Sequence, residues 1–217
     1  MGVTILFDLD GTLIDTEKYF RIYWPKAAEA LGYHMTDEQA LQLRSLGRPF
    51  AFDVFKNMFG EDVDYWAMRQ KRRELMEPVL ERDGVRLKKG VKELLEYMSA
   101  YGHIAAIATA SDVERTRKYL SSIGLEGYFS RIISATMVPF GKPAPDIYRY
   151  ACEQLGIAPG DCYAVEDSPN GITSAYKAGL KVIMIPDQTP PDETVLPMLT
   201  HVYEDAGRII ELLRAHE

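Results

Sequence analysis

The chain has little cysteine, little histidine and no long apolar run. Its 217 residues include only Cys152 and Cys162, which form no Cys-x-x-Cys pair, and four scattered histidines without ligand spacing. These counts indicate neither a disulfide framework nor a cysteine-based zinc site. No run approaches the roughly 18 apolar residues of a membrane span. We therefore expect no membrane partner, and the cysteine usage favours a reducing, cytoplasmic compartment.

The chain is also poor in positive charge. Lysine and arginine number 25 against 32 aspartates and glutamates, a formal net charge of -7 at pH 7. This balance disfavours nucleic acid as a partner, because binding a polyanion needs a basic surface. It still allows a small anionic substrate, since a bound divalent cation outweighs a distant, screened field. The first strand-like run begins directly after Met1-Gly2, so we expect no secretory leader.

Residues 1–15 and 82–217 carry the pattern of an α/β core. Apolar runs of strand length alternate there with amphipathic segments of helix length. The expected strands are 3–7, 103–108, 131–134, 162–165, 182–185 and a short one near 201. Such alternation predicts right-handed βαβ crossovers and a Rossmann-like, doubly wound parallel sheet.

Residues 16–81 interrupt this alternation with helical signals alone. Phe20, Trp24 and Ala28 recur at helical spacing, and Gly32 ends the first segment. The expected helices are 17–31, 37–46, 49–59 and 62–80. We therefore predict an all-α cap domain inserted directly after the first strand.

Two carboxylates, a glycine and a threonine follow the first strand. The run Val3–Phe7 is continuously apolar, which is typical of a parallel strand buried on both faces. Asp8 and Asp10 therefore leave the core together, and two close carboxylates stay ionised only with a cation or strong donors between them. Gly11 allows the backbone to approach a ligand closely. The segment favours Mg²⁺ and a phosphate, although a simple turn explains it equally well when taken alone.

Polar side chains also follow three later strands of the predicted sheet. They are Thr109 and Ser111, with Ala110 between them, and Lys142, Glu166, Asp167 and Ser168. Taken singly, Lys142 fits a solvated loop, Ser111 with Glu114 fits a helix capping box, and the acidic pair fits a helix start. None of these alternatives explains why all four strand ends lie on one edge, where α/β sheets bind ligands.

This set of residues suits phosphoryl transfer to a carboxylate. Asp8 would attack a phosphate monoester and become an aspartyl phosphate. Asp10 would protonate the leaving oxygen and later deprotonate the attacking water. Mg²⁺ held by Asp8, Glu166 and Asp167 would neutralise the repelling charges.

A second group of residues would bind the phosphate. Lys142 would offset negative charge at the phosphate and the carboxylates. The Thr109 hydroxyl and the Ala110 amide, with Ser111 beside them at a helix start, would donate to the phosphate oxygens.

Together these residues resemble the haloacid dehalogenase superfamily, in its branch with a helical cap after the first strand, which includes β-phosphoglucomutase and many small phosphatases. The resemblance lies in Asp8-Leu-Asp-Gly-Thr12, Thr109, Lys142 within Gly-Lys-Pro, and Val165-Glu-Asp-Ser-Pro-Asn-Gly171. It implies Mg²⁺ on Asp8, the Asp10 backbone carbonyl, Glu166 and Asp167, with Asp8 as nucleophile. An acid at the Asp10 position, which the dehalogenases proper lack, points to phosphate esters.

The chain departs from its mutase relatives at Phe20. Mutases of this branch carry a histidine there, and an aromatic hydrocarbon ring cannot carry the proton that this histidine shuttles. We therefore predict Mg²⁺-dependent hydrolysis of a phosphomonoester, with a phosphosugar mutase as the nearest alternative. A catalytically silent phosphometabolite-binding module is the alternative from another class.

The substrate would be a small phosphorylated metabolite, with sugar phosphates as the expected class. Arg48 resembles the cap arginine that contacts a distal phosphate or sugar, although a solvated loop arginine is nearly as good an explanation. We expect Tyr19, Phe20 and Trp24 to share in setting specificity. We also expect a monomer, although no feature of the sequence determines the oligomeric state.

Overall fold

Six parallel strands form the central sheet of the computed structural model, which describes residues 2–216. The strands are β1 (Thr4–Phe7), β2 (Ile104–Thr109), β3 (Phe129–Ser134), β4 (Cys162–Glu166), β5 (Lys181–Met184) and β6 (His201–Val202). Their order is β3-β2-β1-β4-β5-β6, and every neighbouring pair is parallel. This is the doubly wound order, so the predicted Rossmann-like sheet is confirmed.

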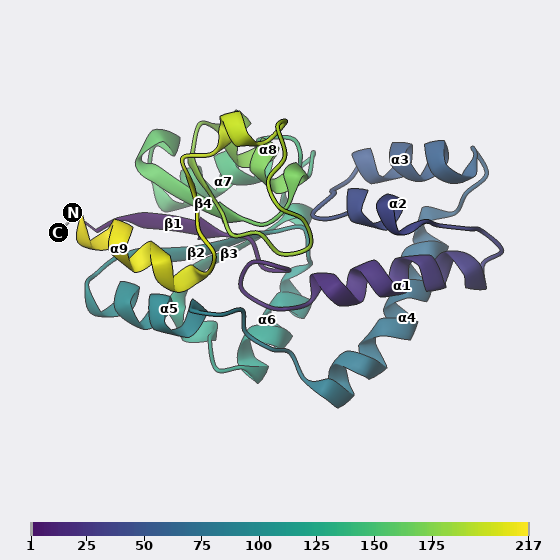
Figure 1. The fold of residues 1–217 in the computed structure, drawn as a ribbon, viewed down its shortest axis with the longest axis horizontal. Coiled ribbons are helices and arrows are strands. Elements are labelled where there is room, and N and C mark those ends of the chain that lie inside the picture. The colour runs from purple at the N-terminus through teal and green to yellow at the C-terminus, as the bar shows by residue number, and fades with distance from the viewer. Residues whose placement is uncertain (1, 217) are drawn as a thin grey trace.

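Helices cover both faces of the sheet. They are α5 (Val91–Ala100), α6 (Val113–Ser122), α7 (Asp146–Leu155), α8 (Pro169–Ala178) and α9 (Ile209–Arg214). Side chains alternate between faces along a strand, so Ile5 and Phe7 of β1 pack with α5, α6 and α9, whereas Leu6 packs with α7 and α8. Figure 1 shows these two helical layers with the sheet between them.

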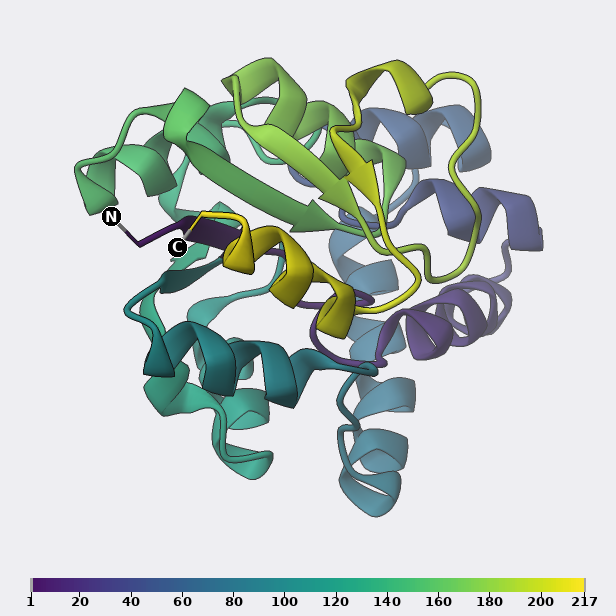
Figure 2. The ribbon, with the colours of Figure 1, turned by 60° about the vertical axis from the view of Figure 1, so that its left-hand side comes forward.

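The cap is the all-helical segment that leaves the sheet after β1. It consists of α1 (Glu17–Ala30), α2 (Asp37–Gln42), α3 (Phe50–Phe59) and α4 (Tyr65–Asp83). Trp24 of α1 meets Phe55 of α3 edge to face, with ring centroids 5.2 Å apart. The predicted helical cap is confirmed, whereas its boundaries at residues 15/16 and 81/82 stay a prediction. The strands point toward this cap in Figure 2, so their carboxyl ends lie against it.

The predicted helix at 37–46 is wrong in length, because α2 ends at Gln42. Thr36 begins this helix with a capping box shared with Gln39. The following residues form a turn of the cap in which Arg44 and Ser45 are buried. Across residues 2–216, no helix is long and apolar enough to span a bilayer.

Candidate active site

Three carboxylates meet where β1 and β4 end side by side. Asp8, Glu166 and Asp167 are all buried, and one oxygen of each lies within 4.8 Å of the others. Gly11 makes this approach possible. Its φ is +87°, and a Cβ there would lie 2.6 Å from Asp167 Oδ2. The backbone at Gly11 therefore approaches a carboxylate of the cluster closely, whereas its predicted close approach to a ligand stays a prediction.

The free oxygens of this cluster fit a divalent cation. Asp8 Oδ2, Glu166 Oε2 and Asp167 Oδ2 are buried and accept no hydrogen bond from any residue between 2 and 216. Such atoms are costly to bury without a partner. Hard carboxylate oxygens are the ligands that Mg²⁺ takes in proteins. The three residues predicted as side-chain metal ligands thus form one donor set of the right chemistry.

Lys142 lies within the same cluster. Its side chain is fully buried, and Nζ donates to Asp8 Oδ1 at 2.5 Å and to Glu166 Oε1 at 2.6 Å. The Tyr148 hydroxyl donates to the same Glu166 oxygen at 2.5 Å. Burial works against the charge of Lys142, but Asp8 and Glu166 outweigh it, and the lysine pKa is raised. The structure therefore places Lys142 among the carboxylates and not in solvent.

The carboxyls of Asp8 and Asp167 hold their protons unusually firmly. Burial raises the pKa of Asp8 from 3.8 to about 7, with Lys142 opposing and Glu166 adding to the rise. Burial, with the neighbouring charges of Asp8 and Glu166, raises the pKa of Asp167 well above its usual value. The folded protein without a metal therefore binds more protons here than the unfolded chain does.

The stability of the metal-free protein is consequently expected to fall as the pH rises. Asp8 has a folded pKa above its unfolded one, so its stabilising effect is present below about pH 4 and lost through about pH 7. The full loss is on the order of a few kcal/mol. Mg²⁺ should offset it, so the metal should raise Tm more at about pH 8 than at about pH 5. Thermal unfolding with and without Mg²⁺ checks this; an equal Tm rise at both pH values would contradict it.

Asp10 is held by three donors that fix its carboxylate. Thr16 Oγ1 donates to Oδ1 at 2.5 Å, Ser111 Oγ donates to Oδ2 at 2.6 Å, and Arg115 Nη2 donates to Oδ1 at 3.0 Å. Sequence reasoning missed Thr16 and Arg115 as partners of Asp10. Arg115 stands four residues after Ser111, one helical turn on, and this spacing is the sequence signal that indicates it.

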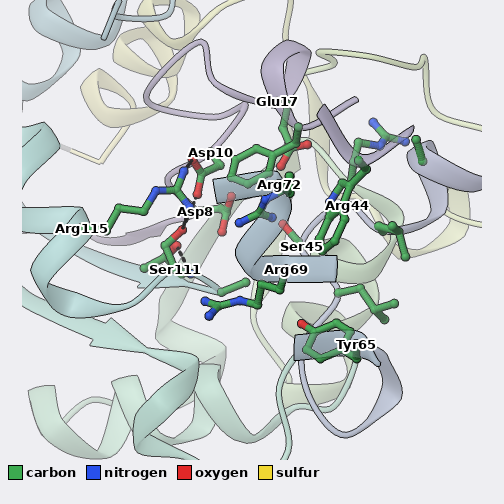
Figure 3. A pocket seen from close by; sticks show the side chains of 17 residues that line it. Asp8, Asp10, Glu17, Arg44, Ser45, Tyr65, Arg69, Arg72, Ser111 and Arg115 are labelled. Atoms are coloured by element: carbon green, nitrogen blue, oxygen red, sulfur yellow. Dashed lines mark hydrogen bonds and ion pairs between the residues drawn. The ribbon is translucent and has the colours of Figure 1, made fainter. Parts of the chain in front are cut away.

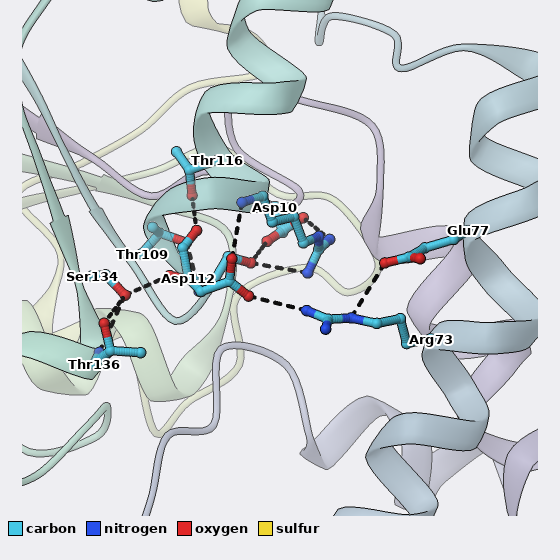
Figure 4. Close-up of polar contacts among 10 residues, drawn as sticks. Asp10, Arg73, Glu77, Thr109, Asp112, Thr116, Ser134 and Thr136 are labelled. Carbon is cyan, nitrogen blue, oxygen red and sulfur yellow. Dashed lines mark hydrogen bonds and ion pairs between the residues drawn. The ribbon is translucent and has the colours of Figure 1, made fainter.

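The predicted capping box of Ser111 and Glu114 is wrong. Asp112 is the N-cap of α6 and accepts from the Arg115 amide at 2.9 Å, which leaves the Ser111 hydroxyl free for Asp10. Asp112 also pairs at 3.1 Å with Arg73 of the cap helix α4 (Figure 4). The start of α6 therefore links the core, the cap and the candidate acid.

Thr109 and Ala110 line the cavity beside Asp8, together with Ser111. Thr109 Oγ1 accepts from the Ser111 amide at 3.0 Å. The threonine hydroxyl keeps its own proton to donate, as a phosphate oxygen requires. The predicted phosphate-binding residues of this strand end therefore share one surface.

A cavity of about 80 Å³ separates these core residues from the cap. Small-molecule sites usually measure about 300–1,000 Å³, so the cap leaves little space above the carboxylates. Figure 3 shows four arginines around this cavity, none of which the sequence predicted: Arg44, Arg69, Arg72 and Arg115.

The predicted specificity residues of the cap fall into two groups. Phe20 and Trp24 line the cavity, whereas Tyr19 and Arg48 are not among its lining residues. Arg48 is exposed, and its guanidinium lies 5.1 Å from the centre of the Trp66 ring. A role for Arg48 in substrate binding therefore stays a prediction.

Comparison with known proteins gives matches along most of the chain. The model of the haloacid dehalogenase-like hydrolase family matches residues 5–185. Hexitol phosphatase B from Escherichia coli K12 is 28% identical over 192 residues, 83% of this chain and 82% of that protein. A phosphorylated carbohydrates phosphatase from Thermotoga maritima is 27% identical over 186 residues, 82% of each chain.

The crystal structure of β-phosphoglucomutase from Clostridium difficile shares the fold. Its TM-score is 0.82 at 20% identity, over 99% of this chain and 96% of that one. The family match and the shared fold confirm the resemblance that the four motifs indicate. The chain therefore belongs to the haloacid dehalogenase-like hydrolase family.

Proposed function

We propose that this protein is a Mg²⁺-dependent phosphomonoesterase that acts on a small phosphorylated metabolite through an aspartyl phosphate at Asp8. The main supporting observation is the buried set of Asp8, Glu166 and Asp167. One carboxylate oxygen of each residue lies within 4.8 Å of the others, and each residue has an oxygen without a hydrogen-bond partner among residues 2–216. The names of two relatives, a hexitol phosphatase and a phosphorylated carbohydrates phosphatase, support a sugar phosphate as the substrate class.

Each residue of the site has a distinct role in the proposed reaction. Asp8, Glu166, Asp167 and the Asp10 backbone carbonyl would hold Mg²⁺, which when bound neutralises charge between the phosphate and the carboxylates. An Asp8 oxygen attacks phosphorus as the ester bond breaks. Asp10 protonates the departing oxygen, and its carboxylate then takes a proton from the water that hydrolyses the intermediate.

The fixed orientation of Asp10 supports its assignment as acid and base. Proton transfer needs a group held within hydrogen-bond reach of the reacting oxygen. Thr16, Ser111 and Arg115 provide that support from three separate positions around the carboxylate. A silent binding module would have no use for an acid held in this way.

Hydrolysis is favoured over mutase chemistry by Phe20. This ring lines the cavity where mutases carry a histidine, and it has no proton to transfer. The mutase alternative therefore lacks the histidine that would transfer the proton.

Phosphate release from a panel of small phosphomonoesters, with and without Mg²⁺, tests the proposal. We expect release that depends on the metal, and phosphorus NMR of the products should show inorganic phosphate. Conversion of a sugar phosphate to its isomer, with dependence on a bisphosphate, would indicate the mutase. Absence of both reactions would leave the binding module as the remaining function.

A further inference from the structure

Three arginines on the cap side of the cavity, Arg44, Arg69 and Arg72, lack an ion-pair partner among the described residues, although the buried carboxyl of Glu17 lines the same cavity. The fourth arginine of the lining, Arg115 of α6 in the core, pairs with Asp10 at 3.0 Å. Within residues 2–216, Arg44, Arg69 and Arg72 have no carboxylate within ion-pair distance. Guanidinium groups enclosed without counter-charge are unfavourable, and this cost indicates a ligand.

Arg72 is the most informative of these residues. Its exposure is 7%, and among the described residues its guanidinium has neither an ion pair nor a hydrogen bond. It stacks instead on Phe20 and Trp24, with the guanidinium carbon 4.5 and 4.4 Å from the ring centres. Burial, with Arg115 and Arg69 nearby, lowers its pKa to about 9. Figure 3 shows this side chain over the cavity, on the side that faces Asp8.

The neighbouring arginines lie around the same space. Arg69 stands three residues before Arg72 on α4, and burial lowers its pKa. Arg44 donates to Leu41 and Thr189, yet its buried Nη1 has no partner within residues 2–216. All three arginines come from the cap. They therefore face the leaving group of a substrate whose phosphate is bound at Asp8.

We propose that Arg72, with Arg69 and Arg44, forms a second anion site, so that the preferred substrates are phosphomonoesters whose leaving group carries its own carboxylate or phosphate. This inference rests on the proposed function. A neutral hydroxyl accepts a hydrogen bond but leaves the buried charge uncompensated, whereas an anion both accepts and neutralises. The contacts of Arg72 with the Phe20 and Trp24 rings then hold its guanidinium group toward the cavity.

Matched substrate pairs test the site. They are 3-phosphoglycerate against glycerol 3-phosphate, and fructose 1,6-bisphosphate against fructose 1-phosphate, so each pair differs by one anionic group. We expect kcat/KM to favour the anionic member of at least one pair by about tenfold or more. The pair that responds shows whether the second anion is a carboxylate or a phosphate. Native protein that favours the neutral member of both pairs would overturn the inference.

Variants at Arg72 separate binding from structure. Arg72→Met should lower kcat/KM for the anionic member by about 10- to 100-fold, mainly through KM, and change the neutral member by less than about threefold. Arg72→Lys should recover part of the loss, and it serves as the informative variant if Arg72→Met does not fold. Lys71→Met, on the same helix and paired with Glu74, is the matched control. Equal loss on both members, together with a lower Tm, would show that Arg72 is only structural.

Binding to an inactive protein distinguishes failure of this site from failure of the proposed function. Calorimetric titration of Asp8→Asn with 3-phosphoglycerate and with fructose 1,6-bisphosphate needs no turnover. We expect tighter binding than for their neutral counterparts, and loss of that difference in the double variant with Arg72→Met. If no ester is hydrolysed by native protein but this difference is present, the phosphatase proposal fails and the anion site holds. If hydrolysis occurs and the difference is absent, the anion site fails.

Discussion

Replacing Asp8 with asparagine is expected to lower kcat for phosphomonoester hydrolysis by at least about 1,000-fold. The amide is no nucleophile, and it removes one anionic ligand from the cluster of Asp8, Glu166 and Asp167. The fold should tolerate the change, because burial already disfavours the Asp8 charge and Glu166 stays 2.6 Å from Lys142 as its ion-pair partner. The metal-free variant should therefore lose less stability than a variant that removes Lys142 itself.

Asp15→Asn is the matched control for this variant. Asp15 lies on the same segment but pairs with Lys18, outside the lining of the cavity. Its replacement should change kcat by less than about threefold, as surface changes usually do little. Steady-state assays and thermal unfolding measure both variants. Retention of more than about a tenth of native activity in Asp8→Asn would rule out Asp8 as the nucleophile.

Replacing Lys142 with methionine should damage both stability and activity. The change leaves Asp8 and Glu166 buried without the ammonium that lies 2.5 and 2.6 Å from them. Removing one partner of a buried ion pair costs about 3–5 kcal/mol. We expect a loss of this size in the free energy of urea unfolding, and a loss of phosphate release of about 100-fold or more.

Mg²⁺ and a surface control make the Lys142 experiment specific. Bound cation should restore part of the lost stability, because it neutralises the same carboxylates. Lys177 is exposed on α8, and Lys177→Met should change the free energy of unfolding by less than about 0.5 kcal/mol. A Lys142→Met protein as stable as Lys177→Met would contradict the charge network described for the site.

The core half of the site was predictable because each strand end is specified locally. An apolar run followed by Asp8, or by Glu166 and Asp167, identifies where a buried strand stops. The parallel topology then brings these ends to one edge of the sheet. Lys142 lies in a loop, and the sequence of this loop alone does not indicate where the lysine side chain lies. Only its place after an apolar run, within that topology, indicated that it enters the cluster.

The cap half was not predictable, because it depends on how the helices dock. The short turn after α2, which the sequence led us to include in a longer helix, buries Arg44, whereas Arg48 four residues later is exposed. Helix α4 has charged residues on most of its surface, so periodicity did not mark Arg72 as buried. Ser111 and Asp112 are both good N-caps, and the contact with Asp10 decided between them.

The covalent intermediate on Asp8 is the feature that most directly separates this mechanism from direct attack by water. Asp10→Asn should block its hydrolysis, while p-nitrophenyl phosphate, whose leaving group needs little protonation, should still form it. Rapid-quench kinetics with this ester and Mg²⁺ should give a burst of about one nitrophenolate per protein, followed by slow turnover. Mass spectrometry of the quenched protein should find the phosphoryl group on Asp8. Absence of a burst, or a phosphoryl group on another residue, would contradict the proposed mechanism.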